Sequence, residues 1–163
     1  MANSSILEKA KRKIIKEFIA DDEITTAIHA CDVVKKEDLI GTHIFDYNQN
    51  PNTIHEVETF ITVQVQIPRG ISIGGVTRVT PVVEIMVYSH QRHMKVSEIP
   101  KVIGNRNDYL SRLIDKKLNG RNDFGLGNMY LVENTEGAYQ MDWLYRRIAF
   151  QCTEINASLC LDE

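Results

Sequence analysis

The chain has 163 residues, of which 43% are hydrophobic and 25% charged, and its formal net charge is −3. This composition predicts one globular domain, residues 1–163, with enough chain to bury a core, and the charge gives no global electrostatic case for nucleic-acid binding. No apolar run approaches the roughly 20 residues that cross a bilayer, so no membrane partner is expected.

The N-terminus lacks the basic and apolar segments of a signal peptide, so we expect the protein to be made and used in a cytoplasm. The three cysteines, Cys31, Cys152 and Cys160, are odd in number and widely spaced. They include no C-x-x-C pair, and this pattern predicts reduced, mostly buried thiols.

Two helices are predicted first. Residues 5–19 place apolar side chains at helical spacing on one face and basic side chains on the other, which is typical of a helix with one solvated side. Contact of this basic face with phosphates is the less favoured alternative. Asp22 is suited to cap a short second helix. Its inward side chains are expected to be Ile24, Ala27, Ile28 and Cys31.

The next elements are strands. Residues 42–47 suggest a short strand, and a loop with Pro51 follows. Residues 59–67 then alternate between polar and aliphatic side chains. This period of two indicates a strand with one face on a core and the other facing water or a partner. Residues 82–88 predict the strand that pairs with it.

The connector between these strands, about residues 68–81, is too long for a tight turn and unusually apolar. It carries Ile71, Ile73 and Val76 around Gly74-Gly75, and Arg69 and Arg78 flank them. The pattern predicts a long hairpin arm that needs a surface to lie on. The arginines serve either solubility or ion pairs with a neighbouring subunit.

One helix and two strands complete the chain. Asn107 is the expected cap of a helix over residues 108–118, whose apolar stripe is suited to pack across the sheet. Strands are predicted at 128–133 and 145–154, with a turn at 134–137 between them. The fold class is therefore α+β. We expect an antiparallel sheet of about four to five strands, packed by an N-terminal helix and one helix between strands, with the arm projecting from it.

No catalytic constellation stands out. His90 and His93 have a spacing that two metal ligands on a helical turn could use, but nothing singles out the further ligands that zinc needs. A polar loop is the preferred interpretation, and a metal-dependent enzyme remains the remote alternative. We expect no catalytic, cofactor-binding or metal-binding residues.

Two further groups resemble functional motifs only superficially. Asp108 and Asp115 share a helix face and, with Asp123, could suggest nuclease carboxylates, but their polar neighbours favour a solvated surface. The glycine clusters, one in the arm and one at residues 125–127, lack the strand–loop–helix context and the lysine of a phosphate-binding loop.

The order of segments resembles the tail terminator, or tail-completion and head–tail joining, proteins of long-tailed phages and phage-tail-like particles. The resemblance covers roughly residues 40–155 and is one of pattern and order. Its residues are Ile44–Tyr47 before the proline-containing loop, Thr59–Val65, an aliphatic strand ending near His90, the helix segment Asn107–Gly120, Gly125-x-Gly127 before a strand, and Tyr145–Phe150.

This resemblance implies a structural protein of the virion tail or neck without enzymatic activity, assembled in the bacterial host cytoplasm. Such proteins form a ring, usually of six subunits, that caps the head-proximal end of the tail tube and stops its polymerisation. The implied partners are other copies of the chain, the tail tube protein, and a neck, connector or sheath protein.

Two expectations remain open from the sequence. A head-to-tail ring needs two different complementary surfaces on each subunit, and the arm is suited to be one of them. Arg69, Ile71, Ile73, Val76 and Arg78 are then interface residues that pack on a neighbouring subunit or on the last tube ring. The alternative is a neck adaptor or stopper that contacts DNA, whereas DNA only passes through the lumen of a terminator ring.

Overall fold

The computed structural model describes residues 5–153 and 155–156, and its strands form two sheets. The large sheet has five strands in the order β1-β2-β5-β7-β6, and the small sheet has three in the order β3-β4-β8. The strands are β1 (Ile44–Phe45), β2 (Thr59–Gln66), β3 (Gly70–Ile73), β4 (Val76–Val79), β5 (Val82–His90), β6 (Met129–Tyr139), β7 (Trp143–Cys152) and β8 (Ile155–Asn156). The α+β class and the predicted strand number of the main sheet are confirmed. All pairs are antiparallel except β1 and β2, which run parallel because a loop, not a hairpin, connects them.

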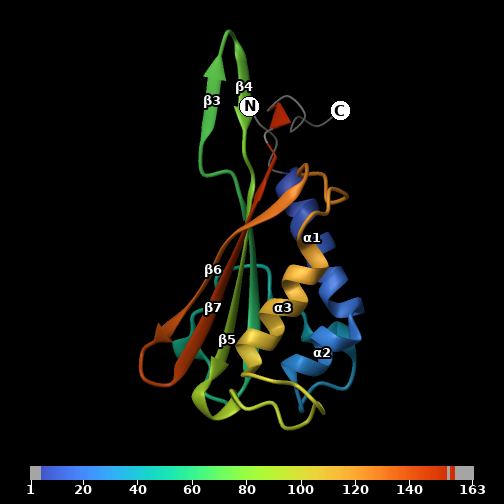
Figure 1. Ribbon diagram of the computed structural model, residues 1–163, viewed down its shortest axis with the longest axis vertical. Coiled ribbons are helices and arrows are strands. Elements are labelled where there is room, and N and C mark those ends of the chain that lie inside the picture. Colours follow the sequence, from blue (N-terminus) through green and yellow to red (C-terminus); the bar gives the residue numbers. More distant parts are fainter. Residues whose placement is uncertain (1–4, 154, 157–163) are drawn as a thin grey trace.

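Three α-helices lie on one side of the large sheet (Figure 1). They are α1 (Ser5–Ala20), α2 (Asp22–Ile28) and α3 (Arg106–Leu118). The apolar stripe of α1, which includes Ile14 and Phe18, packs with the inward residues of β2, β5 and β7 in one buried cluster. The predicted packing by an N-terminal helix and a helix between strands is confirmed. Burial of this apolar surface is the main favourable contribution to folding.

The caps of α2 and α3 differ from the prediction by one and two residues. Asp21, rather than Asp22, accepts hydrogen bonds from the first amides of α2. Asn105, rather than Asn107, accepts from the amide of Asp108 at 2.9 Å. Asn107 is buried instead, where it accepts from the Ser89 hydroxyl at 2.7 Å and ties α3 to the sheet.

The second face of the large sheet is also partly covered. Phe60, Tyr88 and Trp143 pack there with Phe45 and Met86 in a separate buried cluster. The Phe60 and Tyr88 rings stack with centroids 4.9 Å apart. This side of β2 was predicted to face water or a partner. At the start of the strand this prediction is wrong, because the aromatic side chains make a second small core there.

The last hairpin is longer than predicted. Strand β6 continues to Tyr139, and the chain reverses only at Gln140, which has a positive φ of 57°. The turn predicted at 134–137 is therefore wrong. Gly137 lies inside the strand opposite Tyr145, where a Cβ atom would overlap the tyrosine ring. The glycine leaves room for this ring and does not make a turn.

The cysteines are only partly as predicted. Cys152 is buried, and burial raises the pKa of its thiol to about 12, so it is an unreactive core residue. Cys31 is exposed, because α2 ends at His29 in the left-handed region and the chain turns outward. Cys160 lies outside the described residues.

The arm is a two-stranded ribbon of β3 and β4 that projects beyond the helices at one end of the molecule (Figure 1). Gly74 and Gly75 form its tip with φ of 59° and 81°. Two consecutive positive φ values are typical of the tight hairpin turns that fit the twist of β-strands. None of the helices among the described residues is long and apolar enough to span a membrane.

Candidate functional site

The most prominent surface is one face of the arm. In the ribbon, Ile71 lies opposite Arg78 and Ile73 lies opposite Val76. Directly opposed residues of an antiparallel pair share a face, so the three aliphatic side chains lie together. The side chains of Ile71, Ile73 and Val76 are 57%, 76% and 41% exposed. All three apolar residues predicted from the sequence are therefore on one projecting apolar face.

The base of the arm is anchored in the domain. Val79 at the end of β4 is buried, and β4 also pairs there with the backbone of β8. Cys152 donates its amide hydrogen to the carbonyl of Pro81, which joins the arm to the large sheet. Arg69, at the other side of the base, is exposed.

Such a face can bind another protein but offers no chemistry. Full burial of an aliphatic side chain contributes about 1.5–3 kcal/mol, so covering what the three leave exposed contributes roughly 3 kcal/mol for each arm. A subunit whose arm remains in water does not gain this free energy of burial. An assembly in which every subunit buries one arm gains it repeatedly.

The second candidate is a cavity of about 400 Å³ near the C-terminal end of α2, lined by His29, Ala30, Cys31, Asp32, His43, Glu56, Val57, Glu58 and His93. His43 is almost completely buried. Its Nε2 atom lies 3.1 Å from Glu58 and 3.5 Å from Asp32, while its Nδ1 atom has no hydrogen-bond partner among the described residues.

The electrostatics of this cavity favour neutral side chains. Burial, together with repulsion from Glu56 and Asp32, raises the pKa of Glu58 to about 7. Burial also lowers the pKa of His43, although Asp32 acts in the opposite direction. Near neutral pH His43 is therefore uncharged and Glu58 is about half protonated, so their contact is a hydrogen bond and not an ion pair between two full charges.

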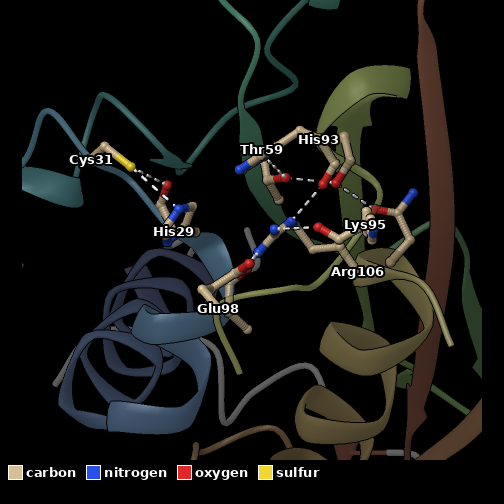
Figure 2. Close-up of polar contacts among 10 residues, drawn as sticks. His29, Cys31, Thr59, His93, Lys95, Glu98 and Arg106 are labelled. Atoms are coloured by element: carbon tan, nitrogen blue, oxygen red, sulfur yellow. Dashed lines mark hydrogen bonds and ion pairs between the residues drawn. The ribbon is translucent and has the colours of Figure 1, made fainter. Parts of the chain in front are cut away.

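Beside the cavity, Arg106 forms the centre of a buried polar network (Figure 2). Only 1% of this residue is exposed. Its guanidinium donates to three backbone carbonyls, those of Ala27 at 2.7 Å, His93 at 2.7 Å and Lys95 at 2.9 Å. It also forms an ion pair with the Glu98 carboxylate. These contacts hold the segment before α3 against the end of α2, which is a structural role.

The two histidines considered as metal ligands have separate partners. His90 accepts from the amide of Arg92 and stacks edge-on against Trp143. His93 hydrogen-bonds with Thr59 at 2.8 Å, and its pKa is lowered to about 4 by burial and by the charge of Arg106. Across the described residues, no group of three or more His, Cys, Asp or Glu side chains could hold a metal ion.

The aspartates considered as nuclease carboxylates are engaged in different contacts. Asp108 lies 3.5 Å from Arg146, and Asp123 lies 2.5 Å from Arg121. Asp115 accepts, through its backbone carbonyl, the amide that ends α3. Asp108 and Asp123 thus form structural ion pairs, whereas one carboxylate oxygen of Asp115 is buried without a hydrogen-bond partner among the described residues.

The DNA-contacting alternative would place Lys116, Lys117 and Arg121 in the lumen of a ring. Lys116 is exposed, whereas the other two are neutralised locally. Lys117 lies 2.7 Å from Asp21, and Arg121 pairs with both Glu17 and Asp123. These side chains therefore present less positive charge than the sequence suggests.

Sequence reasoning missed the cavity and its buried arginine. Arg106 stands four residues before Leu110, on the apolar stripe of α3, and that position is the signal which could have identified it as buried. For His43 and Glu58 no such signal exists. Their contact depends on the parallel pairing of β1 with β2, which places His43 beside the start of β2.

A protein-family model named YomW matches residues 13–152 of the chain. The matched range contains all five strands of the large sheet, the arm, α2 and α3. YomW is a phage-associated family. No curated protein sequence matches the chain.

Proposed function

The chain belongs to the YomW family of phage proteins, and from this premise we propose that it forms a ring at the head-proximal end of a phage tail tube. In this role it is a structural protein, not an enzyme. The ring stops polymerisation of the tube and joins the tail to the neck or, in a contractile particle, to the last sheath ring. Its place is the tail or neck of a virion or of a phage-tail-like particle.

The apolar face of the arm is the observation that carries this proposal. A face with Ile71, Ile73 and Val76 exposed on a projecting ribbon is costly for a monomer in water and requires a second protein surface. A ring supplies that surface in every subunit, because each copy contributes its arm and receives another. The tube protein, whose head-proximal end the ring caps, is the other expected partner.

The charge distribution supports a terminator more than a DNA-contacting adaptor. Lys117 and Arg121 have carboxylate partners within the chain, and the net charge is −3. DNA affinity comes mainly from cations that neutralise phosphates, so a surface of compensated charges binds DNA weakly. We therefore expect DNA to pass through the ring without specific contacts.

The test is removal of the gene from the phage or particle that encodes the chain. Without a terminator, tube polymerisation has no stop at the head-proximal end, so electron micrographs should show tails of variable and excessive length without joined heads. A plasmid copy of the gene should restore uniform tails. Normal tails of uniform length in the deletion strain would refute the proposed function.

A further inference from the structure

We propose that the arm of one copy docks on the outer edge of β6 in a neighbouring copy, so that β3 and β6 pair across the subunit boundary. The inference rests on the proposed function, because it assumes that the chain assembles head to tail. It identifies the two complementary surfaces which such an assembly requires.

Both strands are at the edge of a sheet in the described part of the chain. Strand β3 is the first in its sheet, next to β4, and β6 is the last in the large sheet, next to β7. An edge strand presents backbone amides and carbonyls that can pair with another strand. Addition of a strand to an exposed edge is a common way in which proteins recognise extended segments.

The edge of β6 is open along its later part. At its beginning, Met129 exchanges backbone hydrogen bonds with Gly120 and Arg121, and the amide of Leu131 donates to the Asn119 side chain. Beyond this point, through Tyr139, no strand of the described residues pairs with that edge. The open length exceeds the four residues of β3.

Strand β6 also presents apolar side chains where its open edge begins. Tyr130 and Val132 are 51% and 57% exposed. Val132 is the extra residue of a bulge, because the pairing with β7 shifts between Leu131 and Glu133. A bulge bends the strand and redirects a side chain, so this pair makes an exposed apolar patch suited to Ile71 and Ile73 of an incoming β3.

The charges of the two surfaces are complementary. The arm, residues 68–81, carries Arg69 and Arg78 and no acidic residue. Around β6, four carboxylates share two guanidinium groups. Arg147 pairs with Glu84 and Glu133, and Arg146 pairs with Asp108 and Glu136. The carboxylates of this group outnumber its guanidinium groups, so the acceptor carries negative charge that is complementary to the positive charge of Arg69 at the base of the arm.

A complementation experiment tests this inference with the full-length protein. Ile73→Asp disables the arm, and Val132→Asp disables the acceptor. Both side chains are exposed, so neither substitution should disturb the fold. Each variant alone should stay monomeric in native mass spectrometry at protein concentrations where the wild type assembles. A mixture should form a one-to-one heterodimer, because it contains one intact arm and one intact acceptor.

A disulfide experiment tests the same contact without relying on loss of assembly. Ile73→Cys and Val132→Cys are combined with Cys31→Ser and Cys160→Ser, which remove competing thiols. Mild oxidation should produce interchain dimers and higher multimers on non-reducing gels. The matched control combines Ile73→Cys with Ile103→Cys, which is 86% exposed but lies before α3, and it should crosslink at least tenfold less.

Three results would overturn the inference. They are assembly of Val132→Asp like the wild type, a mixture of variants that stays monomeric, and a wild-type chain that stays monomeric at millimolar concentration. If Ile73→Asp blocks assembly but Val132→Asp does not, the acceptor is another surface of the neighbouring copy, while the proposed function stands. Normal tails after gene deletion would refute the proposed function whatever these variants do.

Discussion

Glu58 and His93 line the same cavity, yet their pKa values are displaced in opposite directions, to about 7 and about 4. Both shifts are caused first by burial, which disfavours the charged form of each group. Folding therefore becomes less favourable when either group is forced to carry its charge. For His93 this loss occurs as the pH falls from 6.5 to about 4, and for Glu58 it occurs as the pH rises from 4.5 to about 7.

The first prediction concerns Glu58→Gln. At pH 8 the folded wild type carries a buried charge that the variant lacks, so the variant should be more stable by up to roughly 3 kcal/mol, given about 1.4 kcal/mol per pKa unit. At pH 4.5 this advantage should largely disappear, because Glu58 is then protonated in the folded state. Urea unfolding curves at both pH values measure the difference.

Glu37→Gln is the matched control, since Glu37 is exposed in the short 3-10 helix Lys36–Leu39. Its effect should stay within about 0.5 kcal/mol at both pH values. A stability difference for Glu58→Gln that does not change with pH would contradict the account of the cavity.

At the scale of single residues, the sequence predicted side chains whose role follows from local periodicity. The buried stripe of α3, with Leu110, Ile114 and Leu118, is confirmed. The buried position of Asn107 was not predictable, because its partners Ser89 and Leu144 come from distant strands. Local signals cannot distinguish a capping asparagine from one that a neighbouring strand binds.

At the scale of elements, Arg106 connects three of them. It joins the start of α3, the end of α2 at Ala27 and the segment that contains Lys95 and Glu98. Burial alone would raise the pKa of Glu98, but the hydrogen bond from Arg106 outweighs it and lowers this pKa to about 2. The ion pair is thus fully formed at neutral pH.

The second prediction is that Arg106→Ala costs about 3–5 kcal/mol in the free energy of unfolding, measured by chemical denaturation at pH 7. The loss arises because the half-buried Glu98 and three carbonyls, that of buried Ala27 among them, would lose their common donor. Arg92→Ala, at the exposed position just before His93, should cost less than about 0.5 kcal/mol. A similarly small cost for Arg106→Ala would show that the network does not hold these elements together.

The elements themselves were largely predictable, and the errors have physical reasons. The strand at Thr59–Gln66 and the helices follow from strong periodicity. The length of β6 was missed because Asn134 and Gly137 resemble turn residues. In the structure, cross-strand ion pairs such as Glu133 with Arg147 and the contact of Gly137 with Tyr145 favour an extended strand there.

At the scale of the whole molecule, apolar surface is distributed unevenly. The helices cover one side of the large sheet, and an aromatic cluster covers part of the other. The arm projects away from the helices (Figure 1), and its aliphatic side chains are exposed. The sequence predicted this arm from its length, its aliphatic residues and Gly74-Gly75. It could not predict which surface covers the arm, because that information lies in the assembly.

The central claim is that the arm builds a ring, and native mass spectrometry of the full-length chain tests it most directly. We expect the wild type to form a closed assembly of a single stoichiometry. Replacement of residues 70–79 by a short turn removes β3 and β4 and should leave a folded monomer. Intact rings after this replacement would contradict the claim.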